Sequence, residues 1–114
     1  MEIFLDLKLL DNNKRVFGNG ILWLLKNIDK LGSIKKASEK MKMSYSKANK
    51  IINNAEKNLK IILLIRYKGG KNKGGANLTN EAKQIIEVFE KYKKKLLSIA
   101  EKGITLELEN IFKW

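Results

Sequence analysis

The order of segments in the middle of the chain constrains the fold more than any other feature of the sequence. Residues 33–102 predict a short helix, a tight turn, a second helix and a strand, then a basic loop between glycine pairs, a short return strand and a long helix. In this order, only one small hairpin interrupts the helices. The sequence therefore predicts a mainly α fold with a small β element, which belongs to the α+β class.

The first two helices of this region have clear start signals. Ser33 and Ser44 are suitable N-caps, and the turn Lys42–Met43 lies between them. Ala37 supplies the small residue that two closely crossing helices need. In the second helix, the apolar residues follow one face, whereas the opposite face carries only amide, hydroxyl and ammonium groups before Glu56. On its own, such a face is more often merely solvated than functional.

A basic loop flanked by glycines follows the second helix. Residues 60–68 predict an Ile-rich strand and residues 76–78 a short return strand, with the loop Gly69–Gly75 between them. Glycines permit positive φ angles and a close approach to a phosphate strand, while Lys71 and Lys73 can neutralise its charge. A nucleotide-binding loop is rejected, because that motif needs G-x-x-x-x-G-K-[ST] at the start of a helix. An inert hairpin loop remains the alternative.

Positive charge is concentrated in this same region. The chain has a net charge of +12, and residues 35–83 contain thirteen Lys/Arg against three Asp/Glu, a net charge of +10. Such an excess of positive charge over a helix pair and a basic loop is typical of a surface that binds the phosphates of nucleic acids. A lysine-rich surface that reflects genome composition alone is the less specific alternative.

The segments before this region predict a strand and a helix. Glu2–Leu10 alternates well enough for a strand, and Asp11–Asn13 is a turn cluster. The next helix is expected to start at Asn19 or Gly20 and to end at Gly32. It is apolar over much of its circumference, which favours burial on two sides, by its own domain and by a partner subunit.

The last predicted helix is long for a chain of 114 residues. Thr79 can cap it, and we expect it to run from Asn80 to about Lys102, with Gly103 closing it and Ile104–Glu109 adding a strand. Its apolar residues step by three and four, which is the period of a coiled-coil seam. The breadth of this stripe favours self-association, with packing on its own domain as the ordinary alternative.

The absence of two residue types excludes several classes of site. The chain has no Cys and no His, so disulfides, the usual zinc, iron–sulfur and haem sites, and Cys–His or Ser–His catalysis are excluded. An enzyme without Cys or His would need a carboxylate pair or a lysine in a cleft, and no spacing in the sequence supports one. We expect a protein that is not an enzyme and holds no metal or cofactor. We also expect a single domain over residues 1–114 in the cytoplasm, because the sequence shows neither a signal peptide nor an apolar run of the roughly 20 residues that a membrane span needs.

The segments together have the layout of a winged helix-turn-helix, in which the second helix of the pair enters the major groove of DNA and the loop contacts its backbone. Lys can donate to guanine, Asn can bond adenine bidentately, and Ser reads either. The residues expected to contact double-stranded DNA are Ser44, Tyr45, Ser46, Lys47, Asn49, Lys50, Arg66, Lys68, Lys71, Asn72 and Lys73. Those expected to form a homodimer are Trp23, Ile85, Phe89, Tyr92, Leu96 and Ile99.

Two motifs also resemble a known family. GSIKKASEKMKMSYSKANKIIN, followed by GGKNKGGANLT, is similar to the N-terminal DNA-binding domain of the ModE-type molybdate-responsive regulators, over about residues 3–100. The resemblance implies operator contacts from the helix that begins at Ser44 and from Lys71 and Lys73, and a homodimer formed by the first and last helices. In these regulators molybdate-binding domains follow this one. Since the chain stops at Trp114, no molybdate site is expected within it.

The predicted function is sequence-specific transcription regulation by a homodimer, and two alternatives stay open. An architectural DNA binder would have the same charge and the same dimer but no preferred sequence, and the amide-rich helix face argues mildly against it. A protein-interaction module would instead use the long apolar helix as its binding surface.

Overall fold

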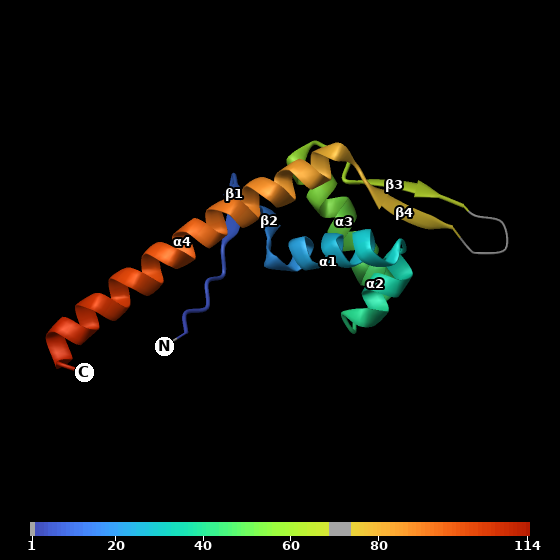
Figure 1. Ribbon diagram of the computed structural model, residues 1–114. Helices are drawn as coiled ribbons and strands as arrows, with labels where there is room; N and C mark the ends of the chain where they lie inside the picture. The colour runs from blue at the N-terminus through green and yellow to red at the C-terminus, as the bar shows by residue number, and fades with distance from the viewer. Residues whose placement is uncertain (1, 69–73) are drawn as a thin grey trace.

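The structure is a computed structural model of the chain and describes residues 2–68 and 74–114. The fold is mixed α+β and mostly helical, with four helices and two separate two-stranded antiparallel sheets among the described residues (Figure 1). In chain order the elements are β1 (Lys8–Asp11), β2 (Lys14–Gly18), α1 (Asn19–Leu31), α2 (Ile34–Lys40), α3 (Tyr45–Leu59), β3 (Leu64–Tyr67), β4 (Gly75–Leu78) and α4 (Asn80–Phe112).

The first sheet is a hairpin that the sequence predicted only in part. β1 pairs with β2 around a turn at Asn12 and Asn13, whose φ angles are 50° and 64°. Asparagine tolerates this left-handed conformation, and two such residues in a row match the twist of a hairpin. The expected strand over Glu2–Leu10 is wrong in its extent, because residues 2–7 are not in a strand and β1 starts at Lys8.

Helices α1, α2 and α3 enclose the core, as their apolar spacing predicted. Ser33 and Ser44 cap α2 and α3, and their hydroxyls accept from the N–H of Lys36 at 3.2 Å and of Lys47 at 3.0 Å. Ala37 is fully buried in α2, which packs against α3. The largest fully buried apolar side chains are Phe17, Leu24, Leu25, Ile28, Ile52 and Leu63.

The second sheet joins the end of α1 to the start of α4. β3 and β4 pair antiparallel, and the N–H of Ala76 donates to the carbonyl of Gly32 at 3.0 Å. Thr79 follows β4 directly. Its hydroxyl accepts from the N–H of Ala82 at 3.1 Å, which caps α4, and donates to the carbonyl of Ile62 at 2.7 Å. These bonds fix the sheet between the helices on either side.

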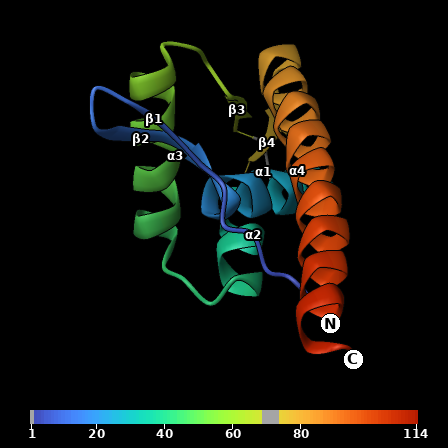
Figure 2. The ribbon, with the colours of Figure 1, turned by 90° about the vertical axis from the view of Figure 1, so that its left-hand side faces the viewer.

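Helix α4 is longer than the sequence predicted. It has 33 residues, which correspond to about 50 Å, and it passes through Gly103, where its end was expected. The segment Ile104–Glu109, expected as a strand, is therefore helical. A glycine inside a helix costs only about 1 kcal/mol, so the residues after it can continue the helix. Figures 1 and 2 show the C-terminal part of α4 extending beyond the other helices, and the molecule measures 64 × 30 × 23 Å.

Candidate nucleic-acid interface

The outer face of α3 presents four of the eleven residues that the sequence predicted to contact DNA. Ser46, Lys47 and Lys50 are exposed, and Asn49 is half-buried at the edge of the face. Ser44 accepts from the N–H of Lys47 and keeps its own O–H as a donor. The N-terminal half of α3 therefore offers hydroxyl, amide and ammonium groups.

Arg66 connects β3 to this face of α3. Its Nη1 donates to Oδ1 of Asn49 at 2.5 Å, and its Nη2 donates to Oδ1 of Asn53 at 3.1 Å. The two asparagines lie one helical turn apart, so that one planar guanidinium reaches both. Arg66 is exposed and has further N–H donors beyond these two bonds. It can therefore hold α3 and contact a phosphate at the same time.

An open cavity of about 360 Å³ lies between β3 and the starts of α2 and α3. Tyr45, Arg66 and Lys68, all predicted DNA contacts, line it. Lys35 lines it as well. Lys35 was not among the predicted contacts, because its place beside Arg66 and Lys68 arises only from the fold. Three cationic side chains around one cavity are suited to an anion such as a phosphate group.

The glycines at the end of the basic loop have a structural task. Gly74 has a φ of +74°, and a Cβ at Gly75 would meet the carbonyl oxygen of Gly32 and the hydroxyl of Tyr67, each at 2.7 Å. The sequence predicted that these glycines approach a phosphate strand. The atoms that Gly74 and Gly75 approach in the structure belong to Tyr67, Lys68 and Gly32. Outside the described residues lie the predicted loop contacts Lys71, Asn72 and Lys73.

Glu56, the one carboxylate of α3, serves the fold. Its Oε2 accepts from the N–H of Leu63 at 2.8 Å and from that of Leu64 at 3.4 Å. Both leucines are buried, so the carboxylate satisfies backbone N–H groups at the start of β3. It also ties β3 to the C-terminal half of α3, which helps to place Arg66.

The β1–β2 hairpin, whose second strand was not predicted, lies beside α3. Lys14 and Arg15, at the start of β2, line an open cavity of about 440 Å³ together with Asn54 and Asn58 of α3. The amide of Asn58 donates to the carbonyl of Arg15 at 3.1 Å, which holds β2 against the helix. Both basic side chains are exposed and add positive charge next to α3. The turn cluster Asp11–Asn13 was the only signal of this hairpin, because the strand after it is short and begins with two charged residues.

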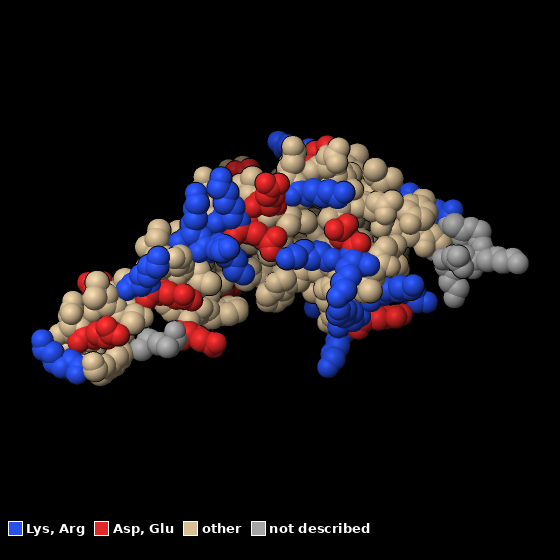
Figure 3. Space-filling view, viewed as in Figure 1, with Lys and Arg blue, Asp and Glu red and all other residues tan. Residues whose placement is uncertain are grey.

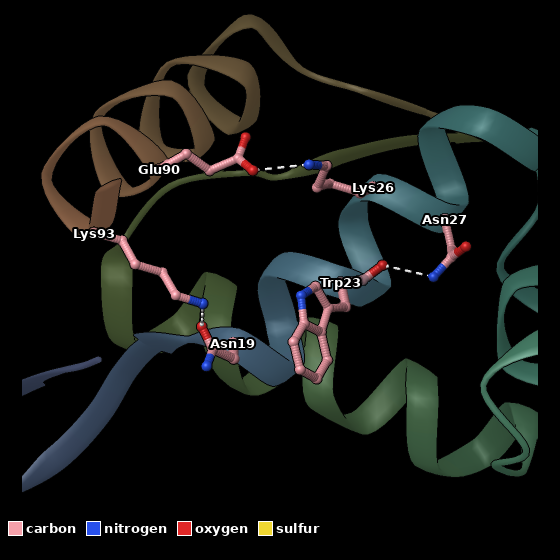
Figure 4. Close-up of polar contacts among 6 residues, drawn as sticks. All are labelled: Asn19, Trp23, Lys26, Asn27, Glu90 and Lys93. Atoms are coloured by element: carbon pink, nitrogen blue, oxygen red, sulfur yellow. Dashed lines mark hydrogen bonds and ion pairs between the residues drawn. The ribbon is translucent and has the colours of Figure 1, made fainter. Parts of the chain in front are cut away.

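Trp23, a predicted dimer contact, lies on α1 beside two polar links to α4 (Figure 4). Its side chain is 48% exposed. Lys26 pairs with Glu90 at 2.8 Å, and Nζ of Lys93 donates to Oδ1 of Asn19 at 2.7 Å. The Lys93 ammonium also lies 6.0 Å from the centroid of the Trp23 ring. These bonds hold α4 across α1 within one chain and leave an aromatic surface at their edge.

The other predicted dimer contacts divide between core and surface. Phe89 is only 3% exposed and packs edge-on against Phe17, with ring centroids 5.0 Å apart. It belongs to the core of its own chain and offers no surface to a partner. Ile85 is half-buried. The predicted contacts beyond Phe89 are exposed: Tyr92, Leu96 and Ile99. An apolar stripe therefore continues past the last buried residue of α4.

Cationic side chains gather in two places on the face drawn in Figure 3, over α2 and over the middle of α4. The lysines within these helices are Lys35, Lys36 and Lys40 in α2, and Lys91 and Lys93–Lys95 in the middle of α4. The lysines of α4 did not raise the net charge of residues 84–114 much, because acidic residues elsewhere in this segment balance them. Positive charge is therefore not confined to the helix pair and the loop.

No known family model matches the chain, and no curated protein has a significantly similar sequence. The resemblance to the ModE-type regulators therefore rests on the quoted residues alone. Within residues 2–68 and 74–114, no helix is long and apolar enough to cross a membrane. The same residues bring no three acidic side chains together as a group that could hold a metal ion.

Proposed function

We propose that the chain is a winged helix-turn-helix protein that binds double-stranded DNA sequence-specifically and regulates transcription as a homodimer. The outer face of α3 carries this proposal. Its N-terminal half is exposed and offers donor groups, and its only carboxylate, Glu56, is engaged by backbone N–H groups. The major groove of DNA admits a helix and reads such groups, so α3 is the proposed recognition helix.

In this proposal, the β3–β4 sheet is the base of the wing. Arg66 of β3, Lys68 directly after β3 and Lys35 of α2 line one cavity next to the start of α3. Phosphate contacts at this point would fix the register of the recognition helix without reading sequence. The bonds from Arg66 to Asn49 and Asn53 support this reading, because they make the sheet and the helix one unit.

The homodimer would form through α1 and α4. Trp23, Leu96 and Ile99 are exposed apolar side chains on these helices. A single recognition helix makes few base contacts, and two of them related by a two-fold axis make a usable operator. The exposed apolar stripe of α4 supports this arrangement, since covering it would remove apolar surface from water.

Selection of randomised duplex DNA by the purified protein at ~0.15 M salt tests the proposal. The expected outcome is enrichment of an inverted repeat whose half-sites lie about one helical turn apart. Lys50→Ala should alter the enriched sequence, whereas Lys94→Ala, which removes the same charge from an exposed position of α4, should leave it unchanged. Retention without enrichment would point to an architectural DNA binder, and no retention would contradict DNA binding altogether.

A protein-interaction module remains the second candidate, and one observation favours it. Beyond Phe89, no residue of α4 is buried, yet this part of the helix carries several large apolar side chains. A module of this kind would bind a different protein tightly and DNA negligibly at physiological salt. The selection experiment separates the two candidates, because only the regulator retains and enriches DNA.

A further inference from the structure

The orientation of two amides on α3 is fixed by their partner. Arg66 donates to the side-chain oxygens of Asn49 and Asn53. A guanidinium has donors and no acceptor, so each amide must turn its oxygen toward Arg66 and its Nδ2 group away from it. Glu56 holds the start of β3 against α3 and thereby restricts the position of Arg66. Each amide is therefore held in one orientation as long as Arg66 makes these bonds.

This orientation leaves the proposed recognition helix rich in donors. Among the described residues, neither Asn49 nor Asn53 donates its Nδ2 group to another side chain or to the backbone. The neighbouring Lys47 and Lys50 are exposed and carry donors only. An adenine amino group would have to share the Asn49 oxygen with the guanidinium. Guanine instead presents two acceptors, O6 and N7, in the major groove.

We propose that Arg66 is a positioning residue that sets base preference: by holding the oxygens of Asn49 and Asn53, it directs Asn49 to guanine rather than to adenine. The inference rests on the proposed function, because it concerns the base that α3 reads. It replaces the bidentate Asn–adenine contact expected from the residue type alone. The role differs from that of Lys68, an exposed cation nearby that lines the same cavity.

The test is duplex selection with wild type and four variants, followed by affinity measurements on duplexes that differ at one base pair. Asn49→Ala identifies the base position that Asn49 reads. Arg66→Ala removes both bonds to α3, and Arg66→Lys keeps the charge but cannot hold two amides in one plane. Lys68→Ala is the matched control, because it removes one positive charge from the same cavity, as Arg66→Ala does, without touching the two asparagines. Circular dichroism checks that every variant is folded.

Wild type is expected to prefer guanine over adenine at the Asn49 position by about tenfold. Arg66→Ala and Arg66→Lys should reduce this preference to about twofold or less, whereas Lys68→Ala should weaken binding to all duplexes and keep the preference. If Arg66→Ala does not fold, the Arg66→Lys result decides alone. The inference is overturned by an adenine preference in wild type, by an unchanged preference in the folded Arg66 variants, or by an Asn49→Ala variant that selects the wild-type sequence. A wild type that retains no DNA would instead overturn the proposed function, and the inference with it.

Discussion

Each polar side chain on α3 either bonds to another element of the fold or faces solvent, and its hydrogen-bonding groups decide which. Glu56 has only acceptor oxygens when ionised, so backbone N–H groups of β3 can engage it fully. Lys47 and Lys50 have only donors and face solvent. Sequence periodicity placed all three on the same helix but could not tell that the carboxylate turns toward another element.

Replacing Glu56 tests its structural task. Glu56→Ala leaves the buried N–H of Leu63 without its acceptor, and we expect the free energy of unfolding to fall by about 1–3 kcal/mol in chemical denaturation. Glu56→Gln keeps an acceptor oxygen and should lose less. Glu87→Ala, on the exposed side of α4, is the control and should change stability by less than about 0.5 kcal/mol. Equal stability of wild type and Glu56→Ala would refute the assignment.

Elements whose ends are set by local chemistry could be predicted from the sequence. The N-caps Ser33, Ser44 and Thr79 all accept from an N–H three residues later, as expected for capping hydroxyls. Gly32 ends α1 with a φ of +73°. Elements that depend on a distant partner could not be predicted. The alternation in Glu2–Leu10 suggested one long strand, but only Lys8–Asp11 has a partner, in β2.

The candidate interface was likewise predictable only where its residues lie within one element. The polar face of α3 follows from helical spacing, because the pattern lies within one element. The bonds from Arg66 to Asn49 and Asn53 join residues 17 and 13 positions apart, and no local pattern indicates them. Likewise, Lys35 reaches the cavity beside Arg66 only through the crossing of α2 and α3. The sequence therefore indicated the surface, while the structure supplied the coupling within it.

The continuation of α4 through Gly103 can be tested by substitution. Gly103 lies inside the helix, and a Cβ there meets no atom within 4 Å, so Gly103→Ala should stabilise this turn by about 0.8–1 kcal/mol. Amide hydrogen exchange of residues 104–112 should become slower. Gly32→Ala is the opposing control, because Gly32 has a positive φ and alanine there should cost about 1 kcal/mol. Faster exchange of residues 104–112 in Gly103→Ala would mean that α4 ends at Gly103.

The whole molecule is extended because α4 reaches beyond the other helices. Its radius of gyration is 17.7 Å, whereas a compact chain of this length would have about 13 Å. The extending part carries large apolar side chains in contact with solvent: Leu96, Ile99, Ile104, Leu106, Ile111 and Phe112. A monomer rarely exposes so many apolar side chains along one helix. The shape therefore favours an assembly in which a second chain covers α4.

A charge on the exposed stripe of α4 should break the proposed homodimer. Ile99 is 69% exposed, so Ile99→Glu has little effect on the folded monomer but places a charge in the proposed interface. We expect the dimer dissociation constant from sedimentation equilibrium to rise by about tenfold to hundredfold. Ser98→Glu adds the same charge on a different face of the helix and is the control. A monomeric wild type, or equal effects of the two variants, would contradict a dimer through this stripe.

Salt dependence links the dimer to the charge of the molecule. If each half-site uses ~4 cationic contacts, a dimer releases ~8 counterions, and the log of the binding constant should fall against the log of the salt concentration with a slope of about −7. An Ile99→Glu monomer carries one half-site, so its slope should be about half as steep. Lys68→Ala should reduce the slope by about one unit per half-site if Lys68 contacts phosphate. Titrations on one duplex between ~0.05 and ~0.2 M salt measure all three slopes. A shallow slope for wild type would show that the cationic surface around α3 does not bind the DNA backbone. Equal slopes for wild type and Ile99→Glu would show that the dimer does not place two such surfaces on one duplex.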